Sequence, residues 1–164
     1  MLGSNMSITA IEKKLIQDSF SKVAPIADTA AEIFYGKLFE YDPSLKRLFK
    51  SDMTSQGRKL MNTLGVAVKG LDDLESLVPV LEGIAIKHVR YGVKIDDYTP
   101  VGNALIYALK TGLGDEFDTK TRNAWVKIYS TIATVMRSAA YPDYDPNTYK
   151  NERHYNKQKK QNYA

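Results

Sequence analysis

The sequence has few side chains that hold metals: its 164 residues include no cysteine and only two histidines. The absence of cysteine excludes disulfides, thiolate catalysis and thiolate metal sites, and it favours a reducing, cytoplasmic setting. A lone histidine cannot build a zinc site. Since His154 falls in a polar tail, a metal held through nitrogen would depend on His88.

Long apolar runs are also missing. No stretch of 18 consecutive apolar residues occurs, so we expect no transmembrane span. The first residues lack the apolar segment of a signal peptide. We interpret the first residues as a leader that precedes a natural start at Met6, and we expect residues 1–6 to lie outside the fold.

Charge of one sign is in only slight excess, since the formal net charge is +4. Five basic and three acidic side chains of residues 143–164 account for half of that excess. The rest of the chain is nearly balanced, which does not indicate a nucleic-acid partner. A tail that mixes lysine and tyrosine could bind a nucleic acid, but a short segment of mixed charge is more typical of a solvated terminus.

Residues 141–164 lack most of the residue types that build a core. They include five tyrosines but no Leu, Ile, Val, Phe or Met. Such a segment cannot bury enough apolar area to offset the entropy lost on ordering. We therefore expect one domain over residues 7–140, followed by a disordered or loosely docked extension over residues 141–164.

Apolar residues of the domain recur at helical spacing, and no alternating strand pattern appears. We expect one helix over residues 29–40 and a short helical turn over residues 44–49. Together with the start and stop signals, these patterns indicate an all-α fold. The start signals are a capping box at Thr9–Glu12, Thr54 or Ser55, Asp72 or Asp73, Thr99 before Pro100, and Asp118. The stop signals are Gly70, Gly92 and Gly114.

Five short motifs follow one another along the chain. They are LFEYDPSLKRLF at 38–49, QGRKLM at 56–61, KHVRYGV at 87–93, YTPVG at 98–102, and AW at 124–125. In this order they resemble the globins, above all single-domain bacterial haemoglobins, the haem domain of flavohaemoglobins and neuroglobin-like globins. The resemblance covers roughly residues 8–140 and implies a globin fold, a three-over-three helical sandwich of about six to eight helices.

The resemblance implies haem b as the cofactor. His88 matches the proximal ligand, whose Nε2 binds iron while its Nδ1–H can donate to the Ile84 carbonyl one turn earlier. Phe49 matches the phenylalanine that packs on the haem face. Without cysteine no thioether attachment is possible, so coordination, burial and propionate contacts would hold the haem. A half-buried histidine with a purely structural role is the alternative.

On the distal side, Tyr35 and Gln56 match the residues that donate hydrogen bonds to a bound gas. Leu60, one turn after Gln56, is expected to form a steric wall. Glutamine stands where many animal globins have histidine, which argues against a bis-histidine resting state. A solvent-facing tyrosine and an exposed first-turn glutamine are the alternatives for the first pair.

Lys59 and Tyr98 match two further positions near the haem. Lys59 corresponds to a residue that often pairs with a haem propionate. Lys59, Tyr35 or Gln56 could also be the sixth iron ligand, and for Lys59 that would require a strongly lowered pKa. Tyr98 matches a tyrosine that acts with a glutamate on the last helix behind the proximal histidine.

The glutamate of that network is missing, because Ala140 stands at its place. This departure argues against peroxidase-like chemistry and fast nitric oxide dioxygenation. The implied function is reversible binding of dioxygen, with nitric oxide and carbon monoxide as other ligands, for oxygen transport, storage or scavenging. Two alternatives are a nitric oxide dioxygenase that works with a separate reductase, and a gas or redox sensor or interaction module. We expect a monomer or a homodimer.

Overall fold

The computed structural model describes residues 7–50 and 52–151, and helices dominate both ranges. Short 3-10 turns join the helices, and no strand occurs in this part of the chain. The all-α prediction is therefore confirmed. The helices are α2 (Ala10–Val23), α3 (Ala27–Tyr41), α4 (Met53–Lys69), α5 (Leu74–Tyr91), α6 (Tyr98–Leu113) and α7 (Thr119–Ala140).

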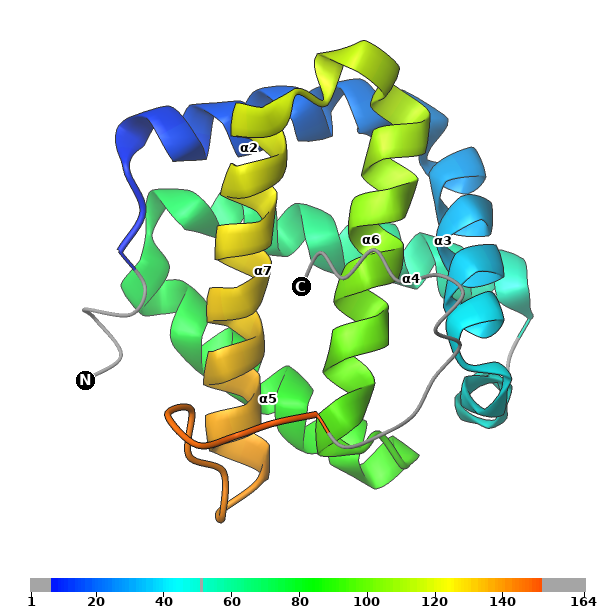
Figure 1. The fold of residues 1–164 in the computed structure, drawn as a ribbon, viewed down its shortest axis with the longest axis vertical. Coiled ribbons are helices and arrows are strands. Elements are labelled where there is room, and N and C mark those ends of the chain that lie inside the picture. Colours follow the sequence, from blue (N-terminus) through cyan, green and yellow to red (C-terminus); the bar gives the residue numbers. More distant parts are fainter. Residues whose placement is uncertain (1–6, 51, 152–164) are drawn as a thin grey trace.

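The six helices cross one another in layers (Figure 1). In that view α6 and α7 run roughly side by side in front, α4 and α5 lie behind them, and α2 crosses at the top. α6 packs mainly on α3, while α7 packs on α5 and α2. In the second half of the chain, α6 thus packs against α3 and α7 packs against α5.

Helix starts follow local capping chemistry, but not always at the expected residue. The capping box of α2 is confirmed, because Glu12 N donates to Thr9 Oγ1 at 3.0 Å and Thr9 N donates to Glu12 Oε1 at 2.9 Å. For α4, the prediction of Thr54 or Ser55 as the cap is wrong. The cap is Asp52, whose carboxylate accepts a hydrogen bond from the backbone of Ser55.

The start of α6 also differs from the expectation. The helix begins at Tyr98, so Thr99 and Pro100 lie inside its first turn and Thr99 is not the cap. The Thr99 hydroxyl accepts a hydrogen bond from the Arg137 guanidinium at 3.2 Å instead. A tertiary contact has therefore replaced the local capping role that the sequence suggested.

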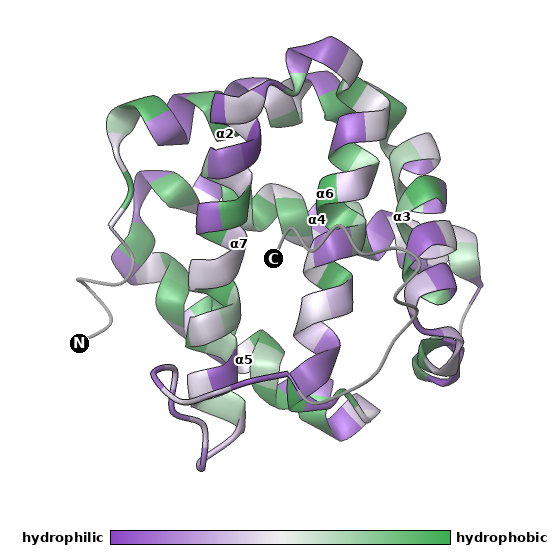
Figure 2. Cartoon of the chain, in the orientation of Figure 1, coloured by the Kyte–Doolittle hydropathy of each residue, from purple (hydrophilic) through white to green (hydrophobic). Residues whose placement is uncertain are grey.

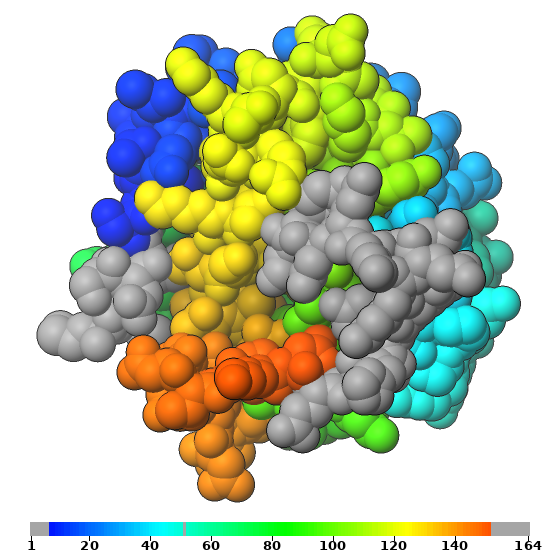
Figure 3. Space-filling view, in the orientation of Figure 1, coloured from blue at the N-terminus to red at the C-terminus, as the bar shows by residue number. Residues whose placement is uncertain are grey.

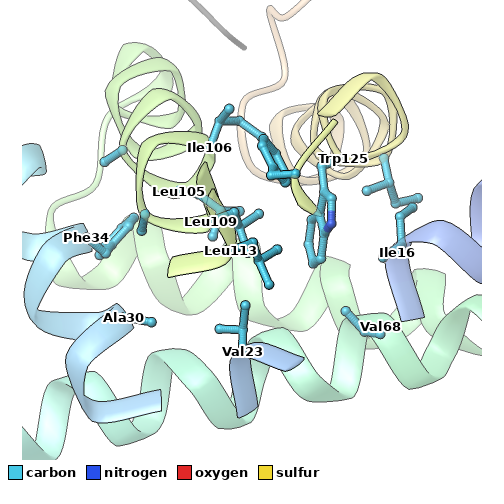
Figure 4. Close-up of a cluster of buried hydrophobic side chains, with 14 of the residues drawn as sticks. Ile16, Val23, Ala30, Phe34, Val68, Leu105, Ile106, Leu109, Leu113 and Trp125 are labelled. Carbon is cyan, nitrogen blue, oxygen red and sulfur yellow. The ribbon is translucent and has the colours of Figure 1, made fainter. Parts of the chain in front are cut away.

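Buried apolar side chains form two clusters. The larger is built mainly on α2, α3, α6 and the first half of α7, and Figure 4 shows the Trp125 indole pointing into it between Ile16 and Leu109. Trp125 Nε1 donates to Ser19 Oγ at 2.8 Å, which satisfies the one polar atom of that side chain. The smaller cluster joins α5, the start of α6 and the end of α7. Its buried members are Leu77, Leu81, Ala85, Tyr98, Ala133, Val135 and Met136.

The segment after α7 is docked as far as the structure describes it. Residues 141–151 form turns at the surface, mostly hydrophilic or neutral in Figure 2 and orange in Figure 3. The hydroxyls of Tyr141 and Tyr149 donate to the 93–97 loop, at 2.8 Å to the Val93 carbonyl and 2.5 Å to the Asp96 carboxylate. The expectation of a disordered or loosely docked extension considered only apolar area, whereas tyrosine hydroxyls hold these residues. Residues 1–6 and 152–164, including His154, lie outside the described ranges.

None of the helices in the described ranges has both the length and the apolar character needed to cross a bilayer.

Candidate functional site

His88 lies in the last turn of α5, where its imidazole is half-buried. Burial lowers the pKa of this histidine, and the Ile84 carbonyl opposes that effect by a smaller amount. The imidazole is therefore neutral at physiological pH, the state in which a ring nitrogen can bind a metal. The Val93 backbone N–H donates to the His88 carbonyl at 3.0 Å and closes the helix end, beside Gly92 with its φ of +100°.

The Nδ1 atom of His88 is buried and finds no hydrogen-bond partner among the described residues. The sequence predicts that the Ile84 carbonyl accepts this hydrogen bond. In the structure the Ile84 carbonyl partly offsets the lowering of the His88 pKa, but it does not meet the geometry of a hydrogen bond with Nδ1. Coordination of a metal through the other ring nitrogen would favour a hydrogen bond from Nδ1 to a carbonyl.

Tyr35 brings a buried hydroxyl from α3 toward the start of α4. Its side chain is 7% exposed, and its hydroxyl donates to the backbone carbonyl of Gln56 at 3.3 Å. The structure thus brings together the two residues predicted for the distal side, through the Gln56 main chain. Burial raises the pKa of Tyr35 to about 12, so the hydroxyl stays protonated and remains a donor at neutral pH.

We expect this raised pKa to make the protein sensitive to alkali. Unfolded tyrosine has a pKa of about 10, so the contribution of Tyr35 to stability is complete below that pH and is lost as the pH rises through about 12. Ultraviolet titration of tyrosinate should show Tyr35 ionising only together with unfolding. Ionisation of every tyrosine near pH 10 in the folded protein, about two pH units earlier, would contradict this expectation.

Three phenylalanines surround the Tyr35 ring. The ring centroid of Phe49 lies 5.1 Å from that of Tyr35, edge to face, and Phe39 stacks on Tyr35 at 6.0 Å. Phe34 contacts it edge to face at 4.9 Å. The predicted Phe49 therefore shares an aromatic group with Tyr35. Phe39 was not predicted as a site residue, although its place one turn after Tyr35 on the same helix face is a usable signal.

The close crossing of α3 and α4 depends on Gly57, which the sequence analysis did not single out. A Cβ at this position would lie 2.9 Å from the Cβ of Ala31, closer than two carbon atoms can pack. Gly57 directly follows Gln56, so the absence of a side chain allows the Gln56 carbonyl to approach the Tyr35 hydroxyl.

We expect Gly57→Ala to separate α3 from α4 and to destabilise the fold by about 1–3 kcal/mol. Gly36→Ala is the matched control, because Gly36 is exposed within α3 and a Cβ there would meet nothing within 4 Å. That change should stabilise the protein by about 0.5–1 kcal/mol through helix propensity. Chemical denaturation measures both, and equal effects of the two substitutions would rule out a tight crossing.

The remaining predicted site residues differ in burial. Leu60 is half-buried and packs against the larger cluster, which also contains Tyr35. Lys59 is exposed, a position that suits contact with a carboxylate at the surface. Tyr98 is buried in the smaller cluster together with Ala85, three residues before His88, and its hydroxyl finds no partner among the described residues. Burial raises the pKa of Tyr98.

The side chains that could bind a metal suit an ion that is already held by a cofactor. In the described ranges no group of three or more His, Cys, Asp or Glu side chains could hold a metal ion. His88 offers one neutral nitrogen, and apolar and aromatic side chains form most of the surroundings of the two predicted faces. One nitrogen ligand and an apolar setting suit the iron of a haem.

Comparison with known proteins identifies the family of this chain. The family model described as Globin matches residues 32–136. The chain is 30% identical over 139 residues to the neuroglobin of Danio rerio, a match covering 76% of this chain and 87% of that protein. It is 29% identical over 136 residues to the flavohemoprotein of Halalkalibacterium halodurans, a match covering 81% of this chain but only 33% of that protein.

A solved structure illustrates the shared fold. It is described as a hexacoordinated heme protein from an anhydrobiotic tardigrade at pH 4, and it matches with a TM-score of 0.75 at 19% identity. The match covers 83% of this chain and 97% of that one. With the family model covering most of the domain from α3 to α7, this chain belongs to the globin family.

Proposed function

We propose that this globin holds haem b non-covalently and binds dioxygen and other diatomic gases reversibly. The observation that carries the proposal is the state of His88, the one histidine in the described ranges. It is a half-buried neutral imidazole on the last turn of α5, in a chain of the globin family. The neuroglobin and flavohemoprotein relatives support the same assignment. The composition, free of cysteine, supports a cytoplasmic location.

When bound, haem would supply an iron atom that takes up the gas. The residues of this chain bind and orient the group. His88 provides the nitrogen ligand, Phe49 and Leu60 provide apolar surface, and Lys59 provides a cation that can pair with a propionate. Tyr98 is buried in the same cluster as side chains of α5, so its ring provides an aromatic packing surface on the proximal side.

Tyr35 provides the hydrogen bond that selects and retains the gas. Its hydroxyl donates to the Gln56 carbonyl at 3.3 Å, which is long for a hydrogen bond of this type. Exchanging that weak partner for a gas that carries partial negative charge is favourable in a dry pocket. The Gln56 side-chain amide is a second donor at the same crossing of α3 and α4.

Nitric oxide dioxygenation is the second candidate, because the chain matches a flavohemoprotein over about a third of that protein's length. Turnover would require electrons from a separate reductase. Ala140 removes the carboxylate that the resemblance places behind the proximal histidine, so we expect such turnover to be slow.

Haem titration followed by absorption spectra of the ferric, ferrous and oxygenated forms tests the proposal. We expect one haem per chain and a stable oxygenated spectrum. Steady consumption of nitric oxide with a supplied reductase would favour the dioxygenase. A folded protein that stays colourless in excess haem would refute the proposal and favour a sensor or interaction module without haem.

A further inference from the structure

We infer that Arg137 and the segment 141–151 clamp the loop that follows His88, and that Arg137 is a positioning residue which sets the electrostatic surroundings of that histidine. This inference rests on the proposed function. We name the side chains of Arg137, Tyr141, Tyr149 and Asn151 the C-terminal clamp, and residues 93–97 the proximal loop.

The proximal loop is joined directly to the backbone of His88. The Val93 N–H donates to the His88 carbonyl at 3.0 Å, and the Asp97 N–H donates to the Lys94 carbonyl at 3.0 Å. The loop therefore begins as the hydrogen-bonded end of the helix that carries the imidazole. A displacement of Val93 would change the last turn of α5, and with it the orientation of His88.

Each clamp side chain donates a hydrogen bond to this loop. Arg137 Nε donates to the Ile95 carbonyl at 3.0 Å, and Asn151 Nδ2 donates to the Asp96 carbonyl at 3.3 Å. The hydroxyls of Tyr141 and Tyr149 donate to Val93 and Asp96, as described above. Four side chains near one end of the chain thus hold a loop that lies 42 to 55 residues earlier in the sequence, where it joins the helix of His88.

Arg137 is a buried cation of an unusual kind. It is 8% exposed, and it makes no ion pair with a carboxylate anywhere in residues 7–50 and 52–151. Its guanidinium carbon lies 4.5 Å from the ring centroid of Tyr149 and 5.4 Å from that of Tyr98. Two aromatic faces and two neutral acceptors contact the guanidinium directly, and Tyr149 links it to the Asp96 carboxylate. The electrostatic effect of a charge is larger in such a dry setting than in water.

The Arg137 guanidinium lies beside the cluster that contains Ala85, a residue of the helix that carries His88. Arg137 contacts the Tyr98 ring, and Tyr98 packs in the same cluster as Ala85, three residues before His88. A cation on this side of the core would favour the reduced, less positive state of an iron held by His88. Ala140, one turn later on α7, adds no opposing carboxylate. The clamp residues lie after residues 32–136, the part that the family model matches.

The test compares three variants of the full chain. Arg137→Met removes the positive charge and the hydrogen bonds of the guanidinium, whereas Arg137→Lys keeps the charge. Tyr149→Phe removes only the hydroxyl that donates a hydrogen bond to the Asp96 carboxylate. Tyr107→Phe is the control, because its hydroxyl makes no hydrogen bond within the described residues. The readouts are hydrogen exchange at the Val93 and Asp97 amides, the ferric-to-ferrous ratio at a fixed potential, and the iron–histidine stretching band.

We expect Arg137→Met to shift the ratio about threefold to tenfold toward ferric haem and to move the iron–histidine band. Arg137→Lys should keep the ratio within about twofold. Tyr149→Phe should speed exchange at Asp97 about tenfold and leave the ratio unchanged, as the hydrogen bond alone is lost. Tyr107→Phe should change neither.

Unchanged ratio and band in a folded Arg137→Met protein would overturn the electrostatic role. If Arg137→Met does not fold, the test falls to Arg137→Lys. A tenfold change in its ferric-to-ferrous ratio would also overturn the electrostatic role, because the charge is kept. Unchanged exchange at Asp97 in Tyr149→Phe would overturn the clamp. Exchange is measurable on the protein without haem, so failure of haem binding in the wild type refutes the proposed function separately.

Discussion

His88→Gly should lose haem under conditions in which the wild-type chain retains it. We expect the affinity to fall by at least about a hundredfold, since even partners outside the metal's own ligand set change metal affinity by tenfold to a hundredfold. The reason is the donor set: no other histidine lies in the described residues, and no acidic cluster there could hold the metal instead. Haem transfer to a competing acceptor protein measures the loss.

Two controls separate ligation from damage to the fold. Free imidazole should restore a nitrogen-ligated spectrum in His88→Gly, because the small ligand can occupy the space of the missing ring. Lys87→Ala changes the exposed neighbour on α5 and should retain haem normally. Normal haem retention in His88→Gly, with an unchanged axial-ligand spectrum, would contradict the assignment.

Tyr35→Phe should speed dioxygen release by about tenfold to a hundredfold. A hydrogen bond to a partly charged acceptor contributes roughly 1.5–3 kcal/mol, and about 1.4 kcal/mol corresponds to a factor of ten. The substitution keeps the ring, so the contacts with Phe39 and Phe49 remain. Stopped-flow displacement of dioxygen by carbon monoxide measures the rate.

The matched comparison is Gln56→Ala, which removes the side-chain amide but keeps the backbone carbonyl that accepts from Tyr35. If the tyrosine is the principal donor, the glutamine variant should change the release rate by less than Tyr35→Phe does. An unchanged rate in Tyr35→Phe would remove Tyr35 from the gas pocket. A larger effect in Gln56→Ala would make the amide the principal donor.

Local signals in the sequence predict the helices well, because capping boxes and terminal glycines act within a few residues. The Thr9–Glu12 box and the end of α5 at Gly92 are examples. The signal at Thr99 failed for a different reason. Its hydroxyl is taken by Arg137, 38 residues away, and such a partner is invisible to a search for local patterns.

The candidate site shows the same division. Spacing and resemblance point to His88, Tyr35, Gln56 and Phe49, and the structure joins three of these around one aromatic group. The crossing at Gly57 could not be predicted, because close approach of two helices is a property of their packing and not of either sequence segment. The contributions of these residues to haem and gas binding stay predictions.

The docked segment shows a limit of composition arguments. Residues 141–151 lack aliphatic side chains, yet they are anchored to the proximal loop. The hydroxyls of Tyr141 and Tyr149 donate hydrogen bonds to that loop. Tyrosine combines an apolar ring with a polar tip, so it can bury area and donate a hydrogen bond at once. A count of aliphatic residues therefore misses the contacts that tyrosines make in residues 141–151.

Resonance Raman spectroscopy of the ferrous protein, labelled with ¹⁵N-histidine, tests the central claim most directly. The account predicts an iron–histidine stretching band that shifts with the label in the wild type and in His154→Ala, the variant of the chain's other histidine. The band should be absent from His88→Gly. A label-sensitive band that persists in His88→Gly, or that disappears in His154→Ala, would contradict the account.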